Sequence, residues 1–290
     1  MSLPGAAPAA GPAGSSAAPP PGSAARLAQH RRERTPDGVE FAFLPADSGR
    51  AGPGGSAEPA GPAPLVFLAA GTIADAFDPY FAQAAAWLVA EGIACAAIDL
   101  PLHGANAVPG QPSELAGWAA AAQAGRDVAD EYLPRARSVL DTLIERGDAD
   151  PVRIAVIGTS RAGYLGLRQL ADDARIRCGV GYAPVTNLRA LSEYRAVDPD
   201  GSNPLIDAAG LPAFADRLAD RPVLLLIGDH DERVSTDDTI ALARRISGFA
   251  HGAGRDSLVD LQVFGGAASH TTPPGAAAQS AQWLRAKLFG

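Results

Sequence analysis

Three side chains that lie far apart in the sequence could together carry out nucleophilic catalysis: Ser160, Asp231 and His270. A serine hydroxyl is a weak nucleophile, so it needs a general base, a group that orients this base, and hydrogen-bond donors for the developing oxyanion. An imidazole can take the serine proton, and a carboxylate can hold the imidazole in the required tautomer. The order serine, acid, histidine therefore predicts a catalytic triad.

Ser160 lies in the segment Gly158–Gly163, which follows a strand-like run, Arg153–Ile157, and opens a helix-like stretch. A nucleophile elbow occupies such a turn, with the serine exposed above the carboxyl end of the strand. The motif Gly-x-Ser-x-Gly would place glycine where this chain has Ala162, but alanine adds only one methyl group and Gly163 keeps the turn slim. The alternative is a serine that only caps the helix, since serine is a preferred N-cap residue.

The candidate acid, Asp231, comes three residues after the end of an apolar run, Val223–Gly228. Asp229 is the alternative acid, although the spacing from the strand end favours Asp231. His270 follows the last apolar run on a glycine-containing loop, which suits a general base at the same sheet edge. The remaining histidines fit less well because of their positions: His30, His103, His230 and His251.

Composition excludes several classes of function. The net charge of −8 leaves no basic face for phosphates, so we expect no nucleic-acid partner, and a small neutral or cationic substrate fits better. No apolar run approaches the ~20 residues of a membrane helix, and the chain does not open with a secretion signal, which predicts a cytoplasmic protein. The histidines and cysteines lack metal-ligand spacing, and no glycine-rich phosphate loop occurs, so we expect no metal and no cofactor. The oligomeric state is left open.

Residues 1–24 are almost wholly Ala, Pro, Gly and Ser, which predicts a disordered tail before a single domain at 25–290. A second such stretch, 49–64, predicts a mobile hairpin loop. Short apolar runs then alternate with amphipathic segments, as expected for strands covered on both faces. We therefore predict an α/β fold with a mostly parallel sheet of about eight strands, including runs at 39–44, 65–70, 93–99, 154–158, 178–183, 223–228 and 258–264.

Helices are expected between these runs. Asp78 suits an N-cap and Pro79 a first helical position, which predicts a helix that ends at Gly92 with Phe81 on its apolar face. Further helices are expected at 135–145, begun by Pro134, and at 236–246 and 277–288.

The order of Ser160, Asp231 and His270 on alternating strands and helices resembles the α/β-hydrolase superfamily over residues 36–290. Within it, the chain is most similar to dienelactone-hydrolase and prolyl-oligopeptidase-like serine esterases, with local matches at 99–104 and 182–186. The resemblance implies a serine carboxylesterase that acts on small to medium acyl groups through an acyl-enzyme. A peptidase or an acyltransferase would use the same triad, and a non-catalytic binding relative is the third alternative.

The resemblance also assigns supporting residues. The backbone amides of Thr72 and Arg161 would form the oxyanion hole, although Ala70 stands where many relatives carry histidine. The side chain of Arg161 could form a structural ion pair or recognise an acidic or carbonyl-bearing substrate.

The family strand order bears on the cysteines and on the pocket. It places two strands between Cys95 and Cys178, which predicts two free core thiols. It also predicts a short cap at 187–221 that narrows the crevice. The candidates for the pocket lining are Trp118, Leu191 and Tyr194, and Trp118 could equally be a core residue.

Overall fold

The computed structural model describes residues 18–46, 61–266 and 269–290. Most of the predicted tail and of the predicted loop at 49–64 therefore lies outside the described residues. The last two residues of the predicted tail already belong to a short helix, α1 (Ser23–Leu27). None of the helices in the described ranges is both long enough and apolar enough to cross a membrane.

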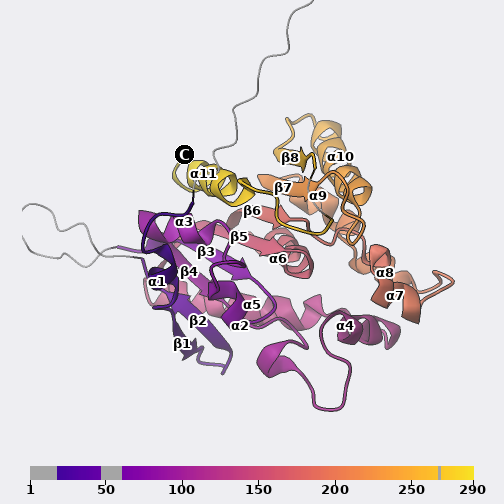
Figure 1. The fold of residues 1–290 in the computed structure, drawn as a ribbon, viewed down its shortest axis with the longest axis horizontal. Helices are drawn as coiled ribbons and strands as arrows, with labels where there is room; N and C mark the ends of the chain where they lie inside the picture. Colours follow the sequence, from indigo (N-terminus) through magenta and orange to yellow (C-terminus); the bar gives the residue numbers. More distant parts are fainter. Residues whose placement is uncertain (1–17, 47–60, 267–268) are drawn as a thin grey trace, which may run out of the picture.

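Eight strands within the described ranges form one sheet (Figure 1), in the order β1-β2-β4-β3-β5-β6-β7-β8. The strands β1 and β2 run antiparallel to their neighbours, and those from β4 across to β8 are parallel. This arrangement confirms the predicted mostly parallel sheet. The strands are β1 (Arg31–Arg34), β2 (Glu40–Leu44), β3 (Ala63–Ala69), β4 (Ala94–Ala97), β5 (Ala149–Thr159), β6 (Ile176–Tyr182), β7 (Val223–Gly228) and β8 (Val259–Phe264).

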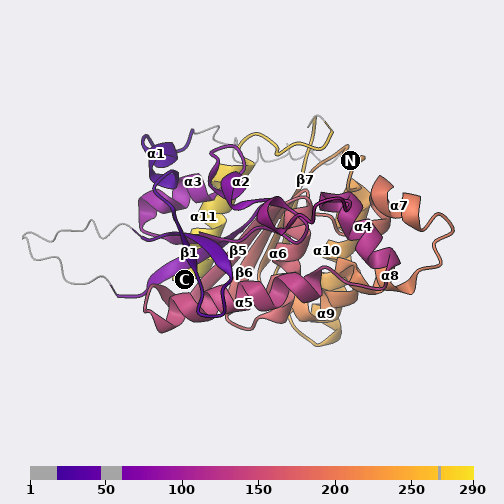
Figure 2. The same ribbon diagram turned by 90° about the horizontal axis from the view of Figure 1, so that it is seen from below.

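Helices cover both faces of the sheet (Figure 2), and each face has its own hydrophobic core. One layer consists of α1, α2 (Ile73–Phe77), α3 (Ala85–Leu88) and α11 (Ala276–Phe289). The other core gathers α4 (Glu114–Gln123), α5 (Ala129–Glu145), α6 (Arg161–Asp172), α7 (Ser192–Val197), α8 (Pro204–Ala209), α9 (Ala215–Leu218) and α10 (Thr236–Gly252). Short 3₁₀ helices occur at Val89–Glu91, Gly104–Asn106, Leu188–Ala190 and Leu211–Phe214.

Burial explains why short apolar runs predicted the central strands. Every residue of β7 is buried, and most of β5 and β6 is covered as well, so neither face needs polar side chains. Cys95 on β4 and Cys178 on β6 are separated by β3 and β5, and both are free and buried, as predicted. Burial raises the pKa of both thiols to about 12.

The prediction of a helix that begins after Asp78 is largely wrong. Thr72 caps an earlier helix, α2, through a capping box with Asp75, and Asp78 ends that helix instead of starting the next one. The Asp78 carboxylate accepts the Tyr80 amide, so the chain turns there, and Phe81 is exposed. The α-helical part is confined to α3, and Gly92 follows at φ 77°, as its predicted stop role requires.

Three further elements differ from expectation. The helix α5 begins at Ala129, so Pro134 lies inside it and does not mark its start. The helix α4 occupies a segment where the sequence predicts no helix. The strand β1 has only charged side chains, and Arg32 and Arg34 are held there by ion pairs to Glu40 on β2, at 2.7 and 2.8 Å.

Candidate active site

Ser160 occupies a sharp turn between the end of β5 and the start of α6. Its backbone angles, φ 56° and ψ −123°, are ones that a residue with a side chain rarely adopts. The turn is held from both sides: the Ser160 amide donates to the Tyr182 carbonyl at 2.9 Å, and its carbonyl accepts from the amides of Tyr164 and Val185 at 3.0 and 3.1 Å. This is the strand-turn-helix geometry of a nucleophile elbow.

Close packing around the elbow explains its small residues. A Cβ atom on Gly163 would stand 2.9 Å from the Gly158 carbonyl oxygen, so a larger residue there would collide with backbone. Ala162, in contrast, is buried in the hydrophobic core, where its methyl group is accommodated. The departure from Gly-x-Ser-x-Gly is therefore compatible with the turn.

The structure brings the three predicted side chains together. The Nε2 atom of His270 lies 2.9 Å from Ser160 Oγ, and its Nδ1 atom lies 2.7 Å from Asp231 Oδ2. With the proton on Nδ1, the imidazole donates to the carboxylate and accepts from the serine hydroxyl. The serine comes from the elbow after β5, the acid from the loop after β7 and the histidine from the segment after β8.

The Asp231 side chain is fully buried and well hydrogen-bonded. Its Oδ1 atom accepts from the amides of Arg233 and Val234 at 3.0 and 3.1 Å. Burial by itself raises the pKa of Asp231, but the bond to His270 and these amides outweigh it, so the pKa lies below its ordinary value. Asp229 is placed differently: its carboxylate accepts the Gly266 amide at 3.2 Å.

The structure does not support Thr72 as a residue of the oxyanion hole. The Thr72 amide donates to the Asp75 carboxylate at 2.9 Å within the capping box, so it is already engaged. Thr72 also does not border the cleft, whereas its neighbours Ala70 and Gly71 do. The spacing Thr-x-x-Asp in the sequence is a capping signature that could have excluded Thr72. The Arg161 amide is the first of α6, a position where no carbonyl of the helix can accept its hydrogen.

A cleft of about 470 Å³ opens beside Ser160 and His270. Charged residues border part of it, and the Arg161 guanidinium forms an ion pair with Glu114 at 3.0 Å. The side chain of Arg161 thus makes the ion pair that the sequence left open, although it does so inside the cleft. Arg233 borders the cleft as well and pairs with Glu193 at 2.7 Å.

The three predicted pocket residues do not border this cleft. Trp118 lies in α4, almost fully buried, and its indole N–H donates to the Pro101 carbonyl at 2.8 Å. Leu191 and Tyr194 are buried in the same hydrophobic core. The aromatic residues that do border the cleft are Tyr80 and Phe81, on the turn before α3, and the sequence did not predict them there.

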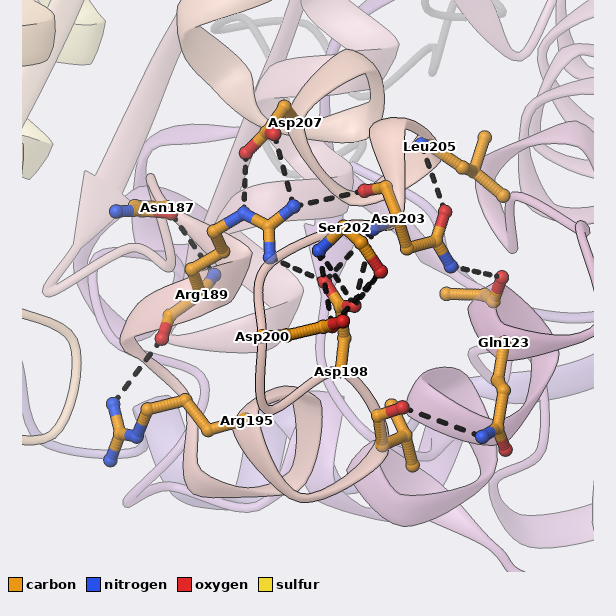
Figure 3. Close-up of polar contacts among 12 residues, drawn as sticks. Gln123, Asn187, Arg189, Arg195, Asp198, Asp200, Ser202, Asn203, Leu205 and Asp207 are labelled. Atoms are coloured by element: carbon orange, nitrogen blue, oxygen red, sulfur yellow. Dashed lines mark hydrogen bonds and ion pairs between the residues drawn. The ribbon is translucent and has the colours of Figure 1, made fainter.

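The predicted cap, 187–221, packs beside α4 and contributes no residue to the cleft. Figure 3 shows the polar network that holds this segment, in which Arg189 pairs with Asp207 at 2.6 Å and donates to the Asn203 carbonyl at 2.9 Å. The Asn203 side chain then donates to the Ala122 carbonyl of α4 at 3.0 Å. These contacts hold the cap together and attach it to α4. In the described part of the chain, no group of three or more His, Cys, Asp or Glu side chains is arranged to hold a metal ion.

Solved structures share this fold. A puromycin-hydrolyzing peptidase from Mycobacterium tuberculosis superposes with a TM-score of 0.66 and 19% identity, over 90% of this chain and 39% of that one. An acylaminoacyl peptidase from Pyrococcus horikoshii gives 0.61 and 13%, over 89% and 41%. An esterase from Pyrococcus furiosus gives 0.60 and 16%, over 90% and 94%. The chain thus spans about two fifths of the two peptidases and nearly all of the esterase.

Comparison with curated proteins gave no significant match. A profile described as the prolyl oligopeptidase family matches residues 117–288, which include the elbow, the acid and the histidine. Because this match covers more than half of the chain, the protein is a member of the prolyl oligopeptidase family of serine hydrolases.

Proposed function

We propose that this protein hydrolyses carboxylic esters of small to medium acyl groups, with Ser160 as nucleophile, His270 as general base and Asp231 as the group that orients it. The observation that carries the proposal is the unbroken line of contacts from Asp231 Oδ2 through the imidazole to Ser160 Oγ, at 2.7 and 2.9 Å. This line opens into a cleft of about 470 Å³, a volume that suits a small substrate.

In the first half of the reaction, Ser160 Oγ attacks the ester carbonyl carbon while its proton passes to His270 Nε2. The carbonyl oxygen becomes an oxyanion, and the Arg161 amide with an amide of the Ala70–Gly71 loop would bind it. The tetrahedral intermediate collapses as His270 returns the proton to the leaving alcohol oxygen. The alcohol departs, and the acyl group remains on Ser160.

In the second half, His270 Nε2 takes a proton from water, and the water oxygen attacks the acyl carbon. The second intermediate collapses onto Ser160 Oγ, which regains its proton and releases the carboxylic acid. The charged Asp231 stabilises the imidazolium that forms in both halves, and its bond to Nδ1 keeps the ring in place.

A peptidase is the second candidate, because the matched family and two of the similar structures are named for peptidases. The same three groups would cleave an amide if the cleft placed the leaving nitrogen within reach of His270 Nε2. The esterase among the similar structures supports the ester alternative. The cytoplasmic location and the small-molecule partner remain predictions.

The test compares nitrophenyl esters of increasing acyl length with the matching nitroanilides, for the wild type and for Ser160→Ala. We expect ester turnover with the shortest acyl chains to be highest and Ser160→Ala to lose roughly 10⁴-fold or more in kcat. Anilide turnover that exceeds ester turnover would favour the peptidase. Ester hydrolysis that survives Ser160→Ala would remove this serine from the mechanism.

A further inference from the structure

Two large aromatic side chains border the cleft without taking part in the hydrophobic core. Tyr80 is 68% exposed and Phe81 is 46% exposed, and their rings contact each other edge to face with centroids 4.8 Å apart. Both lie on the turn between α2 and α3. Exposed aromatic rings grouped at a cavity are typical of a surface that binds an apolar partner.

The turn that carries them is fixed in place. The Asp78 carboxylate accepts the Tyr80 amide at 2.8 Å, and the buried Gln83 adopts φ 49°, a rare angle for a residue with a side chain. The Gln83 side chain donates to the hydroxyl of Thr272 at 3.0 Å and to the Tyr80 carbonyl at 3.4 Å. The aromatic pair is therefore tied to the segment that directly follows the catalytic histidine.

This connection bears on which part of a bound ester the aromatic pair would contact. His270 must hand its proton to the leaving group, so the leaving group has to lie on the imidazole side of the ester carbonyl. Thr272 follows His270 by two residues and borders the cleft together with Tyr80 and Phe81. The charged Arg161–Glu114 pair comes from α6 and α4 instead.

We propose that Tyr80 and Phe81 form an aromatic wall that binds the leaving group and selects esters of aromatic alcohols. The inference rests on the proposed function, because it uses the direction of proton transfer from His270. Aromatic rings that pack edge to face or offset on a bound ring gain more than their buried area alone provides. The wall would thus distinguish a flat aromatic ring from a saturated ring of similar size.

The experiment uses three acetates that yield the same acetyl-enzyme: ethyl, cyclohexylmethyl and benzyl acetate. The last two have alcohols of similar size and reactivity. We expect kcat/KM for benzyl acetate to exceed that for ethyl acetate roughly tenfold, with the cyclohexylmethyl ester between them. In the double variant Tyr80→Ala, Phe81→Ala, the benzyl preference should fall to about twofold or less. Tyr80→Phe should keep the preference, because it retains the ring.

Phe249→Ala is the matched control, since Phe249 is 42% exposed on α10 and does not border the cleft. It should leave all three ratios as in the wild type. Acyl-side selectivity, measured with ethyl phenylacetate and ethyl cyclohexylacetate, should also be unchanged in the double variant. A change there, with no change among the acetates, would place the wall on the acyl side and overturn the assignment.

Two results separate this inference from the proposed function. Acetate hydrolysis that depends on Ser160 but has the same benzyl preference in the double variant would overturn the aromatic wall alone. A second readout needs no turnover: saturation-transfer NMR of benzyl alcohol with Ser160→Ala should show binding that is lost when Tyr80 and Phe81 are also replaced. Equal binding by both proteins would contradict the wall independently of catalysis.

Discussion

Gly158 lies so close to Ala162 that a Cβ atom on Gly158 would stand 2.6 Å from the Ala162 carbonyl oxygen and 2.7 Å from its carbonyl carbon. The contact lies between the carboxyl end of β5 and the first turn of α6, on either side of Ser160. Because all these atoms belong to backbone, no side-chain rotation can relieve a clash. The geometry of the elbow thus requires a residue without a side chain at position 158.

We therefore expect Gly158→Ala to destabilise the protein by at least about 2 kcal/mol, because strand and helix must move apart. Hydrolase activity should fall as well, since Ser160 Oγ would shift from His270. Urea unfolding and kcat/KM measure the two effects.

Gly248→Ala should have the opposite effect on stability. Gly248 is exposed in the interior of α10, and a Cβ atom there meets nothing within 4 Å. Alanine should stabilise this helix by about 0.5–1 kcal/mol without a change in activity. Equal effects of the two glycine replacements would show that the elbow is not sterically restricted.

Replacing the buried acid should change both catalysis and the pH dependence of stability. Asp231→Asn replaces one carboxylate oxygen by an NH2 donor, so the Nδ1–H tautomer is no longer selected and kcat should fall roughly 10³–10⁴-fold. The folded-state pKa of Asp231 is lowered, so its ionised form contributes stability above the unfolded value of about 4, and this contribution is lost as the pH falls through the folded pKa.

The free energy of unfolding should consequently differ most between wild type and Asp231→Asn near pH 7, and the difference should shrink towards pH 3. Urea unfolding across this range measures it. A difference that stayed constant with pH would mean that the charge of Asp231 does not stabilise the fold.

Thr72 should act on stability and not on chemistry. Its side chain accepts the Asp75 amide at 3.1 Å, so Thr72→Ala removes the N-cap of α2 and should cost about 1 kcal/mol of unfolding free energy. Because Thr72 does not border the cleft, loss of its side chain should change kcat less than about twofold. A large loss of kcat in a stably folded variant would show that the side chain supports the reaction as well as the helix.

Arg168 connects α6, the helix that follows Ser160, to neighbouring segments. It is buried, pairs with Asp127 at 3.0 Å and donates to the Tyr164 hydroxyl and the Ala209 carbonyl at 2.9 and 3.0 Å. Arg168→Ala leaves these acceptors buried and should cost about 3–5 kcal/mol. Arg137→Ala breaks an exposed pair with Asp172 and should cost less than about 1 kcal/mol, as thermal unfolding can check.

The sequence was sufficient to predict the sheet and the residues that meet beside Ser160, for a physical reason. Buried strands such as β7 have no polar positions, and the carboxyl ends of neighbouring parallel strands lie at one edge of the sheet. Residues that directly follow β5, β7 and β8 are therefore gathered, whatever their separation along the chain. The family resemblance supplied the strand order that the apolar runs alone do not fix.

The features that the sequence did not predict result from competition between local helix signals and from packing between distant segments. The apolar spacing from Phe81 to Val89 fits a helix, but the Thr72–Asp75 capping box starts one earlier and the chain turns at Asp78. That turn exposes Tyr80 and Phe81 beside the cleft. Trp118 takes the core role that the sequence also allowed, and its ring contacts His103 and Tyr164. The cap packs against α4 and does not border the cleft, a contact between distant segments that periodicity does not report.

Asp229, the alternative acid, joins two neighbouring strands instead of orienting the imidazole. Its amide donates to the Phe264 carbonyl at 2.9 Å, and its carboxylate accepts the Gly266 amide at 3.2 Å. These bonds pin β7 against β8 at the level where both strands end. A slip of one residue between them, about 3.3 Å, would carry Asp231 and His270 out of each other's reach. Alignment of two neighbouring strands thereby sets the distance between the buried carboxylate and the imidazole that it orients.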